Sequence, residues 1–269
     1  MSTIPFEQAS QLAILFHLNS EPWMNQQAYN APRVPHETQN FENAQDIVQL
    51  PAARSTPLFE LIRLRHSCRA FTGAGMTLER FGTLLQQAYG VLGLREDAGG
   101  SLHEIPAPSA GALYPLELYA ISQEVTDLPD GLYHYSGWHH RLECLQSGIK
   151  LSDLLPNLQE QHYIIGANVL LFLAAVFPRT MKKYGPRGYR YILLEAGHVA
   201  QNVCLLAAEQ GLGTLCLGGF RDAYFNNLLG LDPRKAGVMY AIAIGHRGAG
   251  ETEVTRTAPV TYVPHLPKS

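Results

Sequence analysis

Cysteine is scarce in this sequence. The 269 residues include four, and no two of them form a C-x-x-C motif. That spacing argues against a disulfide framework and against a zinc site. Charged side chains are also few, at 16% of the chain, and the formal net charge is −3. A chain with this charge does not attract polyanions, which argues against a nucleic-acid partner.

Long hydrophobic runs are missing as well. The longest one, Val169–Phe177, is too short to span a bilayer, and the N-terminus lacks the pattern of a signal peptide. We therefore expect a cytoplasmic protein with no membrane partner. The apolar share of the chain, 46%, is ample for a large core.

Helical and strand patterns alternate along the chain from about residue 55. Thr56 and Thr77 each precede an amphipathic segment and can cap it, which predicts helices from Pro57 and over residues 78–89. Apolar alternation or continuous apolar runs predict strands at 116–121, 131–135, 141–145, 169–177, 214–217 and 238–244. Three of these strands form a meander, so we predict an α+β fold with a mixed, mainly antiparallel sheet flanked by helices.

The longest predicted helix runs from Tyr189 to the glycines at 211 and 213, where a helix commonly ends. Its apolar residues extend around most of its circumference, which is typical of a helix buried in a core or against a partner chain. Glu195 is expected on its polar face. We divide the chain into an N-terminal helix and extended arm, residues 1–54, and one domain, residues 55–269.

Two motifs carry groups suited to a flat, phosphorylated ligand. Alternate residues of an extended segment point the same way, so Arg65, Ser67 and Arg69 can place two guanidinium groups and a hydroxyl around a phosphate. Basic residues that complement the dipole of a helix C-terminus would give the same pattern. The small residues of 108–112 allow close approach of a ligand to the backbone, or form a tight loop before a strand.

A basic loop is predicted over residues 179–190. Its charge alone indicates no more than a loop exposed to solvent. Lys183 and Tyr184 are adjacent within it, beside Gly185 and Pro186. Neighbours in a regular helix or strand point apart, so both can face one site only where the backbone is irregular. No G-x-G-x-x-G motif follows a strand, no histidine pair has metal-ligand spacing, and no metal is expected.

Together these segments resemble the FMN-dependent nitroreductase superfamily, and more closely its SagB/ThcOx-type dehydrogenases, over roughly residues 55–248. The order and spacing of several motifs carry the resemblance. They are 65–69, 108–115, 131–135, 183–184 with 189–191, 195–202, 211–213 and 244–245.

The resemblance implies a homodimer with an FMN at each of two sites between subunits, and the long helix at the centre of the interface. Arg65, Ser67 and Arg69 would hold the FMN phosphate, ribityl chain and pyrimidine edge, with Arg247 as a further phosphate ligand. The isoalloxazine would lie against backbone of Pro108, Ser109, Ala110 and Gly111. Gly218 and Gly219 would offer a backbone N–H near flavin N5, after Leu217 where many nitroreductases carry glutamate.

SagB-type enzymes oxidise thiazoline or oxazoline rings of peptides to azoles, and their catalytic Lys-Tyr pair matches Lys183 and Tyr184. The unperturbed pKa values of both side chains lie well above neutrality. The one that acts as base therefore needs a lowered pKa to accept a proton near neutral pH. We take Tyr184 as the base and Lys183 as the tuning cation, with the reverse left open. The substrate would be a peptide or carrier-bound azoline, and a cyclodehydratase or synthetase a partner. Two alternatives are an NAD(P)H-dependent nitro or quinone reductase and a non-catalytic FMN-holding scaffold.

Overall fold

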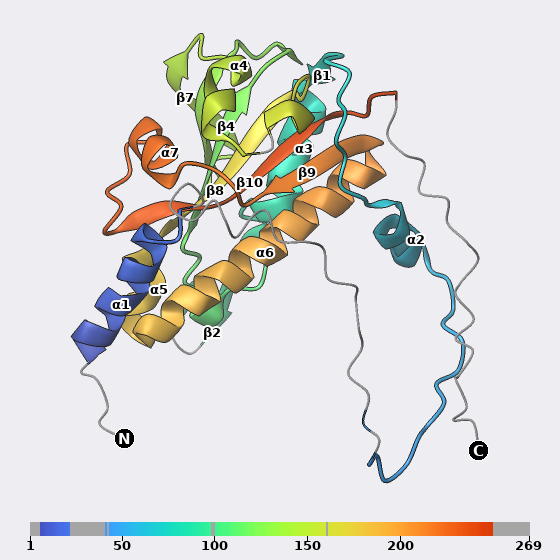
Figure 1. Cartoon of the computed structure of the whole chain (residues 1–269), viewed down its shortest axis with the longest axis vertical. Coiled ribbons are helices and arrows are strands. Elements are labelled where there is room, and N and C mark those ends of the chain that lie inside the picture. The colour runs from blue at the N-terminus through green and yellow to red at the C-terminus, as the bar shows by residue number, and fades with distance from the viewer. Residues whose placement is uncertain (1–5, 22–40, 42, 98–99, 160, 250–269) are drawn as a thin grey trace.

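An antiparallel sheet of six strands forms the centre of the molecule (Figure 1). The computed structural model describes residues 6–21, 41, 43–97, 100–159 and 161–249. The strand order is β7-β6-β4-β8-β10-β9, and each neighbouring pair is antiparallel. These strands are β4 (Leu116–Ser122), β6 (Gly131–Ser136), β7 (Arg141–Ser147), β8 (Val169–Val176), β9 (Leu212–Leu217) and β10 (Ala236–His246).

The predicted α+β class and mainly antiparallel sheet are confirmed. Among the described residues, parallel pairing joins no two strands of this sheet. It joins β1 (Met76–Thr77) to β5 (Val125–Thr126), and Ser67 to Thr214 in an isolated bridge. Strands β2 (Gly93–Asp97) and β3 (Gly100–Glu104) form a separate antiparallel pair.

Helices cover both faces of the sheet. On one face lie α3 (Leu78–Tyr89) and α6 (Pro186–Glu209), and on the other α4 (Leu151–Leu154) and α7 (Asp222–Leu228). Strand β8 is buried on both sides, because Leu171 and Leu173 join the core under α6 while Phe172 faces Phe225 of α7. This double burial explains why β8 reads as a continuous apolar run.

The sequence signals at the helix ends are found in the structure. The Thr56 hydroxyl accepts from the backbone N–H of Phe59 at 3.2 Å and begins α2 (Pro57–Leu64). Thr77 caps α3 in the same way, by accepting from the Arg80 N–H at 3.3 Å. The N-terminal helix α1 (Phe6–Leu18) packs on α6, where His17 Nδ1 lies 3.1 Å from the Tyr189 hydroxyl.

The predicted basic loop over residues 179–190 is wrong. This stretch is helical: α5 (Phe177–Tyr184) is followed directly by α6, with Gly185 (φ 57°, ψ −143°) as the one residue between them. Each helix has proline in its first turn, where the missing N–H costs nothing. A Cβ at Gly188 would lie 2.9 Å from the Met181 α-carbon, so glycine there lets the two helices pack closely.

Helix α6 is long and apolar enough, by length and composition, to cross a membrane. It runs diagonally across the sheet in Figure 1, and half of its most apolar window is buried inside the fold. The core helix of a globular domain has the same character. Two of its leucines, Leu193 and Leu194, are exposed in the single chain.

Candidate functional site

Lys183 and Tyr184 both reach Gly111. They are the last two residues of α5, and Gly111 (φ 65°) lies in the short turn before β4. A Cβ at position 111 would lie 2.9 Å from Lys183 Nζ and 2.7 Å from the Tyr184 hydroxyl. The structure thus brings the predicted catalytic pair onto the predicted ligand-lining segment.

The two side chains also lie beside each other. Lys183 Nζ is 5.3 Å from the centroid of the Tyr184 ring, a cation–π distance. The Tyr191 ring packs edge-on against Tyr184, with centroids 5.1 Å apart. The expectation that the pair needs irregular backbone is wrong, because both residues belong to helix α5 and the irregular residue, Gly185, follows them.

The turn that carries Gly111 has an uncommon backbone. Gly111, Ala112 (φ 51°) and Tyr114 (φ 40°) all have positive φ. For residues other than glycine this conformation costs about 1–3 kcal/mol each, and it persists only where the surroundings fix it. Here the Ser109 hydroxyl accepts from the Tyr114 N–H at 2.9 Å, and an Arg179 N–H donates to the Tyr114 carbonyl oxygen at 3.3 Å.

Behind the turn lies a buried carboxylate that the sequence analysis misplaced. Glu195 of α6 is 3% exposed, so the prediction that it occupies a polar face is wrong. The Tyr89 hydroxyl donates to it at 2.7 Å. Burial raises the pKa of Glu195, although the Ser109 hydroxyl and the bond from Tyr89 act in the opposite direction. One signal was present: Glu195 shares the helical stripe of Ile192 and Val199.

The predicted phosphate-binding residues follow the start of β9. Ser67 forms the bridge to Thr214, and the Cys68 N–H donates to the Thr214 carbonyl at 2.8 Å. Because Cys68 is fully buried, its neighbours Ser67 and Arg69 are directed to the other side of the extended segment. The Arg69 guanidinium lies 5.7 Å from the centre of the Tyr163 ring.

Arg65 and Arg247 belong to the same end of the sheet. Arg65 is close enough to the thiols of Cys204 (α6) and Cys216 (β9) to act on both electrostatically. Arg247 follows β10, and its Nε donates to the Leu212 carbonyl at 3.2 Å. Arg247 therefore lies at the first residue of β9, and Ser67, which stands between Arg65 and Arg69, is bridged to Thr214 of the same strand.

Gly218 and Gly219 follow the last residue of β9. A Cβ at Gly218 would meet nothing within 4 Å, so the backbone there is open to a ligand. At Gly219 a Cβ would collide with Gln159, whose backbone N–H donates to the Gly219 carbonyl at 2.9 Å. Gly218 thus leaves room for a ligand, and Gly219 leaves room for the close packing of Gln159.

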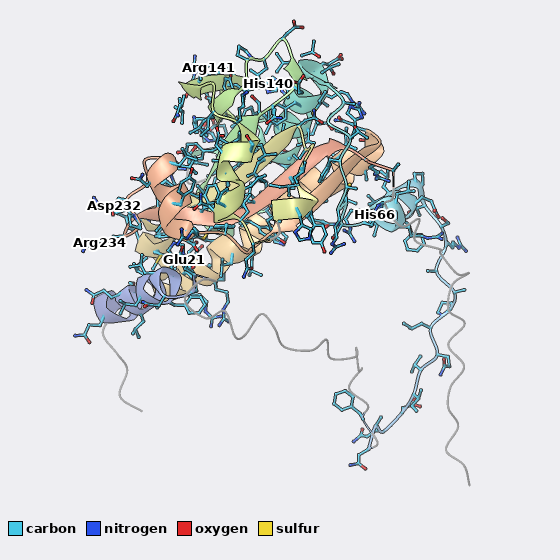
Figure 2. The ribbon with its side chains drawn as sticks, turned by 45° about the horizontal axis from the view of Figure 1, so that its top comes forward. Glu21, His66, His140, Arg141, Asp232 and Arg234 are labelled. Atoms are coloured by element: carbon cyan, nitrogen blue, oxygen red, sulfur yellow. The ribbon has the colours of Figure 1, made fainter. Side chains whose placement is uncertain are left out.

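Within one chain, the Gly111 group and the arginine group lie along different parts of α6. The Tyr184 ring packs on Tyr191 in the first half of the helix, whereas Cys204, on which Arg65 acts electrostatically, is 13 positions further on, which is about 20 Å along a helix axis. Figure 2 shows His66, the neighbour of Arg65, on the opposite side of the molecule from Glu21 and Arg234.

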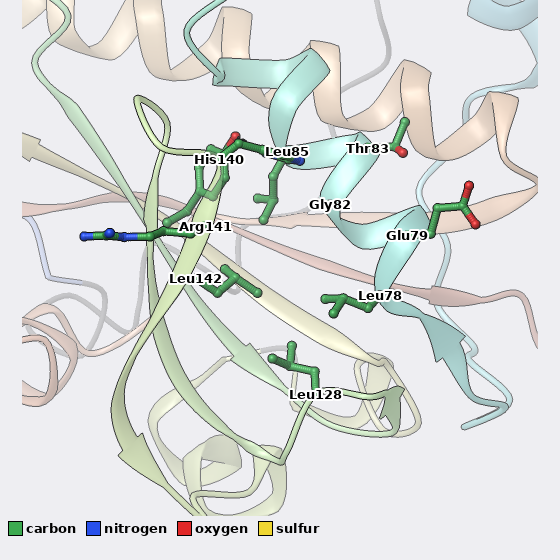
Figure 3. A pocket seen from close by; sticks show the side chains of 10 residues that line it. Leu78, Glu79, Gly82, Thr83, Leu85, Leu128, His140, Arg141 and Leu142 are labelled. Carbon is green, nitrogen blue, oxygen red and sulfur yellow. Dashed lines mark hydrogen bonds between the residues drawn. The ribbon is translucent and has the colours of Figure 1, made fainter.

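A pocket of about 630 Å³ lies elsewhere, between α3 and the β6–β7 hairpin (Figure 3). Leu78, Leu85 and Leu142 form apolar walls, and His140 and Arg141 stand at its hairpin side. None of the predicted site residues lines it.

The chain belongs to the nitroreductase family, because the model of that family matches residues 62–246. MJ1384 of Methanocaldococcus jannaschii, a nitroreductase by name, is 35% identical over 182 residues, which are 68% of this chain and 88% of MJ1384. The microcin B17-processing protein McbC of Escherichia coli is 30% identical over 48% of this chain and 49% of McbC. The trifolitoxin-processing protein TfxB of Rhizobium leguminosarum bv. trifolii is 30% identical over 52% of this chain and 39% of TfxB.

Solved structures share the fold. A chain of the E. coli microcin synthetase McbBCD complex, determined with truncated pro-MccB17 bound, superimposes with a TM-score of 0.69 at 21% identity, over 90% of this chain and 94% of that one. A nitroreductase by name from Desulfovibrio desulfuricans, in complex with FMN, has a TM-score of 0.52 at 19% identity, over 79% and 100%. The predicted family and fold are confirmed, and the protein is a nitroreductase-family oxidoreductase.

Proposed function

We propose that this protein is an FMN-dependent dehydrogenase that oxidises thiazoline or oxazoline rings, in a peptide or carrier-bound substrate, to thiazoles or oxazoles. The observation that carries the proposal is the convergence of Lys183 and Tyr184 on Gly111. The names of McbC and TfxB, both peptide-processing proteins, support a peptide substrate.

The residues around β9 fit FMN. Guanidinium groups bind phosphate through strong bidentate bonds, and Arg65, Arg69 and Arg247 lie at one end of the strand. The open backbone at Gly218 lies four residues after Thr214, about 13 Å along the strand. A flat ring system joined to a phosphate spans such a distance, so β9 can bind both ends of one cofactor.

A homodimer would complete this site. In the same chain, Tyr191, which contacts the Gly111 group through Tyr184, and Cys204, on which Arg65 acts, are about 20 Å apart along α6. The Gly111 group of a second copy, packed along α6, would supply the missing side. The exposed Leu193 and Leu194 of α6 support such packing, as do Leu58 and Ile62 on α2.

The chemistry needs a base and a hydride acceptor, and FMN supplies the acceptor when it is bound. The ring loses one proton from carbon and a hydride from the neighbouring carbon, and dioxygen is the expected final acceptor of the electrons. We assign the proton to the hydroxyl oxygen of Tyr184. Lys183 Nζ lies 5.3 Å from the centre of that ring and supplies the neighbouring positive charge.

Lys183 and Gly111 also help to orient the reacting groups. Because position 111 carries no side chain, the ends of Lys183 and Tyr184 lie directly on its backbone. Substrate placed over this turn would meet both side chains at once, and orientation of this kind is a large part of catalytic power. The fold similarity to a McbBCD chain supports a synthetase partner, and we propose a cytoplasmic location for the complex.

The test begins with purification of the full chain, its absorbance spectrum, and the mass of the released cofactor. The FMN-loaded protein is then incubated in air with a synthetic thiazoline peptide, with and without the synthetase partner. Loss of two hydrogen atoms from the peptide supports the proposal. A protein that neither carries nor takes up FMN would contradict it.

An NAD(P)H-dependent nitro or quinone reductase is the second candidate, favoured by the name of MJ1384. It predicts that NAD(P)H bleaches the bound FMN rapidly. The third candidate, a non-catalytic FMN scaffold, predicts that Lys183→Ala and Tyr184→Phe leave azole formation by the assembled complex unchanged.

A further inference from the structure

Helix α5 meets the turn before β4 at two points, and the proposed reaction uses only one of them. At the first point Lys183 and Tyr184 lie against Gly111. At the second, a guanidinium N–H of Arg179 donates to the Tyr114 carbonyl oxygen at 3.3 Å. Residues four apart in a helix share one face, so Arg179 and Lys183 reach the turn from the same side of α5. Four residues of helix span about 6 Å, so the second contact lies one helical turn from the first.

Arg179 makes another bond with the same guanidinium group. Its second terminal nitrogen donates to Glu117 Oε1 on β4, which forms an ion pair. A planar guanidinium serves two such acceptors at once only in one orientation, whereas the ammonium group of lysine has no fixed fork. The two bonds therefore hold the Arg179 side chain between β4 and the end of the turn.

Glu117 is itself held by His134 of β6. His134 Nε2 lies 2.9 Å from Glu117 Oε2, and His134 Nδ1 lies 3.1 Å from Glu143 Oε2 on β7. Ionised carboxylates only accept hydrogen bonds, so both ring nitrogens carry a proton and the ring is an imidazolium. The hydrogen bond to Glu117 raises the pKa of His134, which agrees with this form. Three adjacent strands thus support the carboxylate that orients Arg179.

The turn needs a hold of this kind at its end. Ala112 and Tyr114 have positive φ although neither is glycine, and such backbone persists only where its surroundings fix it. The bond from Arg179 is made to the carbonyl of the second of these residues. The Arg179 side chain is 42% exposed, and an ion pair open to solvent adds little to global stability. The bonds of Arg179 therefore act mainly on the local geometry of the turn.

We propose that Arg179 is a positioning residue: its two bonds, to β4 and to the carbonyl at the end of the turn, set the position of Gly111 against the end of α5. The proposal rests on the function proposed for Lys183 and Tyr184. Its physical content, that Arg179 holds the turn, can be tested without any substrate.

The first experiment measures hydrogen–deuterium exchange of segment 109–116 in the full-length protein. Arg179→Gln removes the fork and should speed exchange there at least about tenfold, the factor for loss of one charge-assisted hydrogen bond. Arg179→Lys keeps the charge without the fork and should fall between Arg179→Gln and the wild type. Arg80→Gln is the matched control, because Arg80 also donates to a backbone carbonyl, that of Gln210, at the opposite end of α6 from α5. It should leave exchange in 109–116 unchanged.

The second readout is steady-state kinetics of the FMN-loaded variants with a thiazoline peptide in air. Arg179→Gln should lower kcat by about 10², the loss that a misplacement of about 1 Å can cause. KM and FMN content should stay near the wild-type values, because the substitution moves the reacting groups without removing a binding group. An ion pair with only a structural role would lower thermal stability and leave kcat unchanged.

The outcomes separate the two proposals. If the wild type oxidises no azoline but Arg179→Gln speeds exchange in 109–116, the proposed function fails and the positioning role of Arg179 stands. If Arg179→Gln matches the wild type in exchange and in kcat, or if Arg179→Lys restores both fully, the positioning role is overturned. Should Arg179→Gln fail to fold, Arg179→Lys decides: faster exchange in 109–116 than in Arg80→Gln supports the proposal, and equal exchange overturns it.

Discussion

The Tyr184 hydroxyl rests on the backbone of Gly111, so close that a Cβ there would stand 2.7 Å from it. The two residues are 73 positions apart in sequence and come from different elements, the end of α5 and the turn before β4. The absence of a side chain at position 111 is therefore what lets the Tyr184 hydroxyl lie in this place. Any side chain at 111 must displace the group that we assign as the base.

Gly111→Ala should therefore reduce activity at least tenfold while the protein still folds. The colliding atoms are the flexible ends of Lys183 and Tyr184, which can move aside. Gly148→Ala is the control, since Gly148 has a similar φ of 74° and open space around its α-carbon. Both variants pay about 1–2 kcal/mol for the left-handed backbone, so thermal unfolding should show similar losses. Equal activity in the two variants would remove the special role of Gly111.

Tyr184→Phe and Lys183→Ala should lower kcat by about 10²–10⁴, the usual contribution of a positioned acid or base. FMN content should stay at the wild-type level, because neither residue belongs to the arginine group. Lys182→Ala is the neighbouring control, since Lys182 lines a groove between α1 and α5. Steady-state kinetics with a thiazoline peptide, beside a flavin spectrum of each variant, checks this prediction. Wild-type turnover in both variants would leave the pair without a catalytic role.

Arg65→Gln and Arg69→Gln should each weaken FMN binding about tenfold or more, since a charge-assisted hydrogen bond contributes roughly 1.5–3 kcal/mol. Titration of apoprotein with FMN, followed by quenching of flavin fluorescence, gives the dissociation constants. Arg141→Gln is the control, because Arg141 lies on β7 at the opposite edge of the sheet and pairs with Glu143. An affinity that falls equally in all three variants would indicate a general effect of charge.

Leu194→Asp should yield monomers that bind FMN poorly, because the proposed site needs a second copy along α6. Leu194 is 55% exposed in the single chain, so the substitution should change the stability of the subunit by less than about 0.5 kcal/mol. Leu145→Asp, at a 52% exposed position on β7, is the control. Light scattering after size-exclusion chromatography measures the mass. A monomeric wild type that binds FMN tightly would contradict the dimer.

The docking of α1 should weaken as the pH falls below about 6.5, the ordinary pKa of histidine. Burial lowers the pKa of His17, because the charged ring is penalised between Phe177 and Tyr189. In that pH range His17 binds a proton when the helix is undocked but not when it is docked, so acid favours undocking. The protection factors of residues 6–18, which are corrected for the intrinsic fall of amide exchange in acid, should decrease between pH 7 and pH 5 in the wild type. In His17→Gln, which cannot titrate, protection that falls as steeply would refute the assignment.

Much of the fold follows from local signals in the sequence. Threonine caps at 56 and 77 and the glycine at 90 set the bounds of two helices, because their chemistry acts within one turn. Strand β8 was evident from its apolar run. The α5–α6 junction was mispredicted, since Gly and Pro were taken as marks of a loop. In the structure Pro186 begins a helix and Gly185 alone makes the turn.

The sequence suggested candidate site residues but not their geometry. Residues 65–69 and 183–184 were chosen as candidates from their types, their spacing and the family resemblance. The contact of Gly111 with Lys183 and Tyr184 depends on the packing of α5 against β4, a long-range relationship that no local pattern carries. Glu195 was misplaced for a related reason: a glutamate on an apolar stripe was taken as exposed, and its partners Tyr89 and Ser109 lie far away in sequence.

The most direct test is a mass spectrum of a thiazoline peptide after aerobic incubation with the FMN-loaded protein and, in parallel, with its Tyr184→Phe variant. We predict that the wild type removes two hydrogen atoms from the peptide and that the variant leaves it unchanged. An unaltered peptide in both samples, from a protein whose bound FMN is bleached by NAD(P)H, would contradict the account and favour a nitro or quinone reductase.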